Sequence, residues 1–150
     1  MTPVETFALG QTTGTAEGAP LSDLLAGGTP TGVRVPGLVL EAQYRFGEEF
    51  LLLTTEDVPY EEALHAVLLG RCHAIVDRLQ LGHPFAAGIL TDLQPAAGGS
   101  LRFSFFGGDL WELTIAPARR RFRPSEAPRG VKGRLLRLLV PRRLVLVRLR

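Results

Sequence analysis

Residues 101–115 read Leu-Arg-Phe-Ser-Phe-Phe-Gly-Gly-Asp-Leu-Trp-Glu-Leu-Thr-Ile, and this stretch decides the fold class of the 150-residue chain. Two apolar runs, 101–106 and 110–115, flank Gly107-Gly108-Asp109, where glycine supplies the positive φ that tight hairpin turns demand. The sequence therefore predicts an antiparallel hairpin. We expect its aromatic side chains to form cross-strand pairs and to anchor a core; they are Phe103, Phe105, Phe106 and Trp111.

Further strands are predicted upstream of this hairpin. Residues 38–46 alternate between apolar and polar side chains, the period of two that is typical of a half-buried strand. Residues 47–49 interrupt the pattern and 50–55 resume it, which indicates a second hairpin. Residues 88–93 are predicted to form another strand, which ends at the Pro- and Gly-rich stretch 95–99.

Residues 59–81 admit two interpretations. As a helix, their apolar side chains fall at a spacing of 3.6 residues. As a hairpin, residues 64–69 and 74–81 flank a four-residue loop that begins at Gly70. Gly70 in the middle of a helix would cost about 1 kcal/mol relative to alanine. This cost and the strands on either side favour the hairpin, whereas a helix at about 60–80 would make the fold α+β.

The chain is expected to have three parts. Residues 1–32 are rich in Thr, Gly, Ala and Pro and are expected to form a flexible arm, because they offer little apolar surface to offset a backbone entropy of roughly 1–2 kcal/mol per residue. Residues 33–116 are expected to form a mainly β domain, an antiparallel meander closing as a sandwich or open barrel. Residues 117–150 are expected to pack on that domain, with a basic amphipathic helix at 131–140 and a terminal strand at 144–149.

Charge is divided unequally along the chain. Residues 117–150 contain eleven arginines, one lysine and one glutamate, a net charge of +11, whereas residues 1–116 contain five arginines and fourteen acids, a net charge of −9. The basic segment would bind phosphate groups of nucleic acid or acidic lipid, or would pair with acids of the same chain. The candidate anion-binding residues are Arg119, Arg120, Arg121, Arg123, Arg142 and Arg143.

No enzyme motif is present in the sequence. Serine-hydrolase (G-x-S-x-G), zinc-protease (H-E-x-x-H), phosphate-loop and dinucleotide-binding patterns are all missing. His65, Cys72, His73 and His83 lie within nineteen residues, but without the short paired spacings of zinc ligands. Cys72 and His73, as neighbours in an extended chain, would point to opposite faces. We therefore expect no catalytic residue, no metal site and no cofactor.

The compartment is expected to be the cytoplasm. The single cysteine, Cys72, excludes an intramolecular disulfide. The first residues lack the basic and apolar regions of a secretory signal, and no apolar run is long enough to span a bilayer.

The leading hypothesis for function is a non-enzymatic interaction domain that binds another protein through an edge strand, an acidic loop or the C-terminal segment. The acidic loop offers Glu56, Asp57, Glu61 and Glu62. One alternative is an anion-binding module that recognises nucleic acid or a membrane surface through the arginine-rich segment. A second alternative is a small ligand-binding barrel or enzyme, with a pocket lined by Trp111 and phenylalanines and with His83 or Asp92 near its mouth.

Overall fold

Antiparallel strands make up the regular structure of the chain. The computed structural model describes residues 1–58, 60–117, 131–132 and 142–150, and these ranges contain no helix long and apolar enough to cross a membrane. One sheet has six strands, in the order β1 (Thr2–Pro3), β5 (Val39–Phe46), β6 (Glu49–Thr55), β7 (Leu64–Leu69), β8 (Ile75–Leu81) and β12 (Val131–Lys132). A second sheet has the order β13 (Leu144–Arg148), β11 (Asp109–Ile115), β10 (Ser100–Phe105) and β9 (Thr91–Ala96), and a third has the order β2 (Phe7–Ala16), β3 (Ala19–Ala26) and β4 (Thr29–Pro36).

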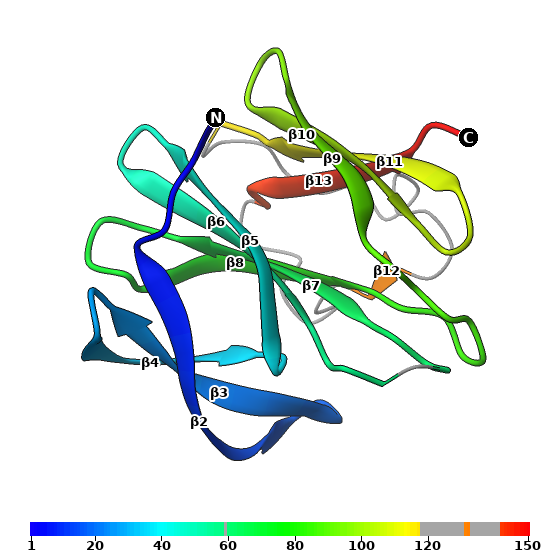
Figure 1. Ribbon diagram of the computed structural model, residues 1–150. Coiled ribbons are helices and arrows are strands. Elements are labelled where there is room, and N and C mark those ends of the chain that lie inside the picture. Colours follow the sequence, from blue (N-terminus) through cyan, green and yellow to red (C-terminus); the bar gives the residue numbers. More distant parts are fainter. Residues whose placement is uncertain (59, 118–130, 133–141) are drawn as a thin grey trace.

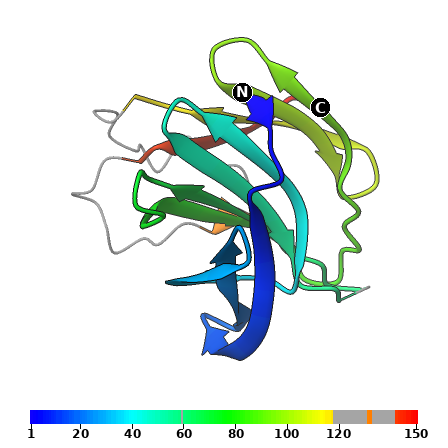
Figure 2. The same ribbon diagram turned by 60° about the vertical axis from the view of Figure 1, so that its left-hand side comes forward.

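The six-stranded sheet is the middle of three layers, with the four-stranded sheet on one face and the three-stranded sheet on the other (Figures 1 and 2). Residues of β6 show why. Leu51 and Leu53 face the four-stranded sheet, whereas Leu52, between them, faces the three-stranded sheet, and all three are fully buried. A strand with both faces covered carries an uninterrupted apolar run in place of an alternating one. The expected packing of antiparallel sheets, as in a sandwich or open barrel, is confirmed.

The two cores are unequal in size. The larger one lies between the six-stranded and four-stranded sheets and includes every fully buried aromatic side chain among the described residues, namely Phe103, Phe105 and Trp111. The smaller one lies between the six-stranded and three-stranded sheets. Its buried members are Phe7, Leu24, Val35, Leu52, Val67 and Leu69.

The prediction of a flexible arm over residues 1–32 is wrong, because most of this segment forms β2, β3 and the start of β4. Two turns of two residues make this compact sheet. Glu17-Gly18 joins β2 to β3 and Gly27-Gly28 joins β3 to β4, with positive φ at all four residues, as tight hairpin turns between twisted strands require. The sheet is held because Phe7, Leu24 and Val35 bury the second face of the middle sheet.

The predicted hairpins are confirmed. β10 and β11 pair as the sequence suggested, with Phe103 opposite Trp111. β5 pairs with β6 over the expected residues. Between residues 59 and 81 the structure contains the hairpin β7–β8, so the helix alternative is wrong. The amide of Gly70 donates to the carbonyl of Ala74 over 2.9 Å and closes the turn between these two strands.

The strand predicted at 88–93 lies three residues later, as β9 from Thr91 to Ala96. Pro95 is tolerated within it because β9 is the edge of its sheet, where a missing backbone donor costs no ladder hydrogen bond. Gly88 precedes the strand and packs on the ring of Phe105, where a Cβ would lie only 2.2 Å from Cζ.

The end of the chain belongs to the four-stranded sheet. β13 pairs with β11, and Leu144 and Leu146 enter the larger core, which confirms the predicted terminal strand. Of the helix expected at 131–140, Val131–Lys132 instead pairs with β8 as β12, and the remainder lies outside the described residues.

Candidate functional site

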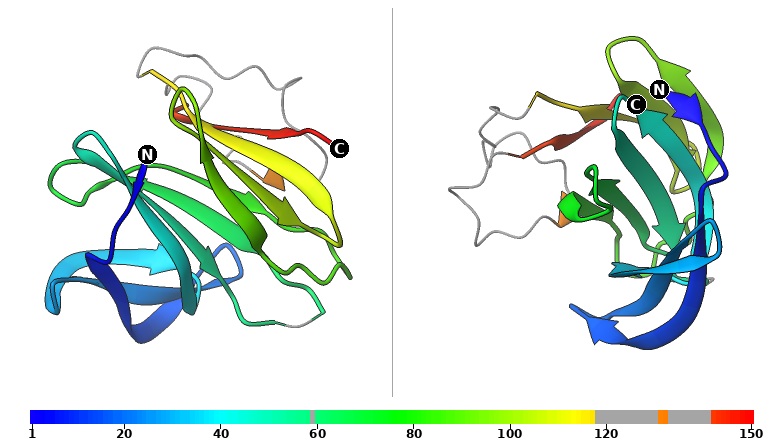
Figure 3. Two further views of the ribbon diagram at one scale, coloured as in Figure 1. Left: turned by 45° about the horizontal axis from the view of Figure 1, so that its top comes forward. Right: turned by 90° about the vertical axis from the view of Figure 1, so that its left-hand side faces the viewer.

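Two loops lie side by side at one end of the middle sheet. The β6–β7 loop comprises residues 56–63 and the β8–β9 loop residues 82–90. Leu64 at the start of β7 pairs with Leu81 at the end of β8, so the register itself brings the two loops together. A Cβ built on Gly82 would lie 3.4 Å from the Cβ of Ala63, and both loops occupy the same end of the molecule in Figures 1 and 3. We call this region the loop end.

Large apolar side chains are exposed at the loop end. Phe85 exposes 90% of its surface, Tyr60 82% and Ile89 75%, and these are the three most exposed large hydrophobic residues in the described part of the chain. Val58, in the same loop as Tyr60, is also exposed. Single exposed apolar residues are ordinary on protein surfaces, but several in two neighbouring loops form a candidate for a binding surface.

Phe85 occupies a backbone position that suits glycine. The amide of Ala86 donates to the carbonyl of His83 over 3.2 Å, which closes a β-turn with Pro84 and Phe85 at its centre. Phe85 has a φ of +60°, in the left-handed region. Proline followed by a residue of positive φ is the pattern of a type II turn, whose third position normally holds glycine or asparagine. A bulky residue there is strained by about 1–2 kcal/mol.

The β8–β9 loop is anchored on both sides of this turn. Leu81 is fully buried before it, and after it Leu90 packs against the larger core. Gly88 allows the loop to lie directly on the Phe105 ring. The exposed Phe85 therefore projects from a fixed base.

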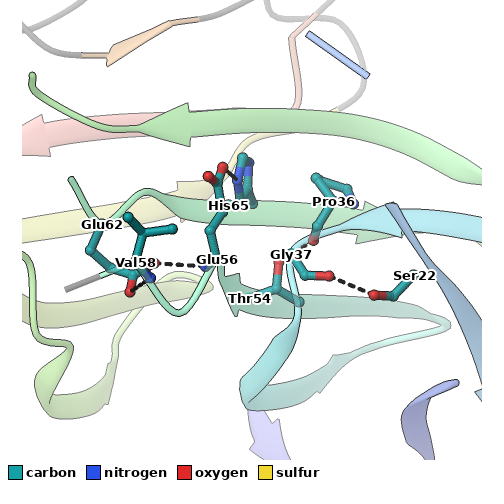
Figure 4. A network of polar contacts seen from close by, with 8 residues as sticks. All are labelled: Ser22, Pro36, Gly37, Thr54, Glu56, Val58, Glu62 and His65. Atoms are coloured by element: carbon teal, nitrogen blue, oxygen red, sulfur yellow. Dashed lines mark hydrogen bonds and ion pairs between the residues drawn. The ribbon is translucent and has the colours of Figure 1, made fainter. Parts of the chain in front are cut away.

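The β6–β7 loop is held by a buried carboxylate (Figure 4). Glu62 accepts hydrogen bonds from the backbone amides of Glu56, over 2.6 Å, and Val58, over 3.0 Å. Its side chain is buried, so both oxygens are satisfied by the backbone of the loop itself. Hydrogen bonds to a charged acceptor are roughly twice as strong as neutral ones. Glu62 thus fixes the shape of the loop that presents Tyr60.

His65 and Glu56 form the second contact of this network. Nε2 of His65 lies 2.6 Å from Oε1 of Glu56, and the imidazole is buried. Burial lowers the pKa of His65 below its ordinary value of 6.5, and Arg78 lowers it further, against the opposing effect of Glu56 and Glu62. The neutral imidazole therefore donates its Nε2 proton to the carboxylate, which can only accept.

A third set of contacts links the three-stranded sheet to the middle sheet close to His65. Thr54, opposite His65 in the sheet, donates its hydroxyl to the carbonyl of Pro36 over 2.6 Å. Ser22 donates to the carbonyl of Gly37 over 2.7 Å. Gly37 has a φ of +105°, and a Cβ there would lie 2.7 Å from the Thr54 side chain. These buried contacts, drawn in Figure 4, fix the chain between β4 and β5.

The acidic loop predicted from the sequence separates into two kinds of residue. Glu56 and Glu62 point into the network and hold the loop. Asp57 and Glu61 are exposed, and within the described residues no hydrogen bond or ion pair engages their carboxylates. Asp57 and Glu61 are thus the exposed acids of this loop.

The predicted anion-binding arginines fall into two groups, those outside the described residues and those that form ion pairs within the chain. Arg119, Arg120, Arg121 and Arg123 lie outside the described residues. Arg143 forms a bidentate ion pair with Glu49, in which both N–O distances are 2.7 Å. Nη1 of Arg142 lies 3.3 Å from Oδ1 of Asp77. Both of these arginines thus pair with acids of the same chain.

The residues considered for metal or catalytic chemistry are dispersed. His73 stacks edge-on against Phe7 and Phe50, His83 lies exposed in its turn, and Cys72 is a free, exposed thiol. Within the described ranges no group of three or more His, Cys, Asp or Glu is placed to hold a metal ion. Of the residues suggested to form a pocket, Trp111 is buried in the larger core and Asp92 is exposed.

Sequence reasoning missed Val58, Tyr60, Phe85 and Ile89. A signal was present for Val58, Tyr60 and Phe85, since each is a large apolar residue next to a proline and outside the strands that the sequence predicts. Ile89 fell within the strand predicted at 88–93, and it is exposed because the strand begins only at Thr91. Comparisons of the chain with known protein families, with characterised proteins and with solved structures find no match.

Proposed function

We propose that this chain is a non-enzymatic interaction domain that binds another protein through the loop end. The observation that carries the proposal is Phe85, an aromatic residue that is 90% exposed and held at a positive φ where glycine would be unstrained. Strain of this kind persists when the surrounding structure imposes it, and it gathers at functional positions. Aromatic side chains are also the residues that most often dominate binding energy in protein interfaces.

The rest of the loop end supports this proposal. Tyr60 in the β6–β7 loop and Ile89 in the β8–β9 loop add further exposed apolar side chains, and tyrosine is enriched in interfaces because its ring buries a large area at low entropic cost. The buried carboxylate of Glu62 and the anchors around Phe85 prepare both loops before binding. A prepared surface loses less entropy on association than a mobile one.

The proposed location is the cytoplasm. Cys72 is the single cysteine of the chain and its thiol is exposed and unpaired. A reducing compartment keeps such a thiol free.

Photo-cross-linking at position 85 tests the proposed function. A photoreactive phenylalanine analogue replaces Phe85 in cells of the source organism, and the same analogue replaces Leu149, an exposed apolar residue beyond β13, as the matched control. We expect a protein that cross-links from position 85 and not from 149, and whose purified form binds the wild-type chain at least tenfold more tightly than the Phe85→Asn variant. Equal cross-linking from both positions, or equal affinity for wild type and variant, would contradict the proposal.

A further inference from the structure

The two loops that expose the apolar residues are acidic, and this charge indicates the chemistry of a partner. The two loops contain four acids, Glu56, Asp57, Glu61 and Glu62, and neither loop contains a lysine or an arginine. Glu56 and Glu62 are engaged by His65 and by backbone amides. Asp57 and Glu61 remain exposed, one on each side of Val58 and Tyr60 in the sequence, with no partner in the described part of the chain.

We propose that the partner presents a basic segment in which lysine or arginine side chains alternate with aliphatic ones. This inference rests on the proposed function, since it names the chemistry that the loop end would recognise. The aliphatic side chains of such a segment would pack on Phe85, Tyr60 and Ile89. Its cations would pair with Asp57 and Glu61, which have no competing partner in the same loops.

The aromatic rings also favour cations. An arginine or lysine placed over the face of a tyrosine or phenylalanine is attracted by the ring quadrupole. Tyr60 is followed directly by Glu61, so one guanidinium has a ring and a carboxylate within one residue of each other in the sequence. Within the two loops, an acidic or phosphorylated segment would meet the like charge of Asp57 and Glu61, and an anionic membrane surface would meet the same repulsion.

Selection from a random peptide library tests the partner's chemistry. Twelve-residue peptides displayed on phage are selected on the full-length wild-type chain and counter-selected on the Tyr60→Ser/Phe85→Asn double variant. We expect the retained peptides to be enriched in Lys or Arg together with Leu, Ile or Phe. For synthetic copies of the best of them, we expect Asp57→Asn/Glu61→Gln to weaken binding five- to tenfold, and an increase from 50 to 300 mM NaCl to weaken it comparably.

Matched controls separate the two proposals. Glu5→Gln removes one exposed acid between β1 and β2 and should leave the affinity unchanged, as should Leu149→Ser. Peptides that depend on Phe85 and Tyr60 but are acidic or uncharged, or that ignore Asp57→Asn/Glu61→Gln, would overturn the basic partner and leave the interaction domain standing. If no peptide depends on Phe85 or Tyr60, and the cross-linking experiment also finds none, the interaction domain itself is overturned.

Sedimentation with lipid vesicles tests whether the loop end binds a membrane surface instead of a protein. We expect no sedimentation of the chain with phosphatidylcholine vesicles or with vesicles containing phosphatidylserine. Binding to either that is lost in Phe85→Asn would overturn the protein partner in favour of a lipid surface.

Discussion

His65 and Glu56 share a hydrogen bond of 2.6 Å at the point where the β6–β7 loop joins the buried middle sheet. The histidine is the cross-strand neighbour of Thr54, and the glutamate begins the loop that presents Tyr60. A buried, uncharged imidazole thus holds the first residue of the β6–β7 loop.

The pH dependence of stability follows from this burial. Because burial lowers the pKa of His65 in the folded chain, the unfolded chain takes up a proton more readily, and stability is lost as the pH falls below about 6.5, the ordinary pKa of histidine. Urea unfolding between pH 7.5 and 5.5 should show this loss in wild type and a flatter profile in His65→Gln. The exposed His83→Gln variant should keep the wild-type profile; identical profiles for all three proteins would contradict the assignment.

Glu62 is expected to stabilise the loop through its two backbone hydrogen bonds. In Glu62→Gln one oxygen becomes an amide group that cannot accept, so a part-buried backbone amide loses its charged acceptor at a cost of about 1–2 kcal/mol. Denaturant unfolding measures this loss. Glu61→Gln, next in the chain but exposed, should stay within about 0.5 kcal/mol of wild type.

Gly88 is expected to be intolerant of any side chain. A Cβ at this position would lie 2.2 Å from the buried ring of Phe105, which cannot move aside, so Gly88→Ala should destabilise the fold by about 1–3 kcal/mol. In the same loop a Cβ on Gly82 would meet Ala63 at an ordinary 3.4 Å. Comparison of the two alanine variants by thermal unfolding checks the packing, and an equally stable Gly88→Ala would show that the loop does not rest on Phe105.

The pair of Arg143 and Glu49 is expected to hold the C-terminal strand. The two side chains are only 14% and 21% exposed, and the contact is two-pronged, so a double-mutant cycle with Arg143→Met and Glu49→Gln should give a coupling of about 1–3 kcal/mol. The exposed pair of Arg71 and Glu48 is the matched comparison, for which we expect about 0–1 kcal/mol. Equal couplings would show that burial adds nothing.

The hairpins could be predicted because their signals are local. Gly107-Gly108 between two apolar runs specifies a turn and two strands without reference to the rest of the chain. The same reasoning, applied to Glu17-Gly18 and Gly27-Gly28, would have found β2–β4. The low apolar content of residues 1–32 predicted a flexible arm in spite of these turn signals. The sheet forms because its few apolar side chains pack on the apolar face of the middle sheet.

The need for a layer on this second face of the middle sheet could have been predicted from Leu51-Leu52-Leu53. Consecutive leucines in a strand point to opposite faces, so both faces must be buried and the six-stranded sheet needs a layer on each side. The candidate site is harder to predict. Exposure of Phe85 depends on how Gly88 rests on Phe105, which lies seventeen residues further along the chain, and no local pattern encodes such a contact.

Stability and affinity measured on the same Phe85→Asn preparation test the central claim most directly. Asparagine adopts the left-handed backbone conformation more readily than phenylalanine does. The free energy of unfolding of the variant should therefore equal that of wild type or exceed it by up to about 1 kcal/mol, and its melting temperature should not fall. The variant should bind the cross-linked partner at least tenfold more weakly. This combination, a fold that gains or keeps stability while it loses binding, is the predicted result. A variant that unfolds earlier and binds as tightly as wild type would contradict the account.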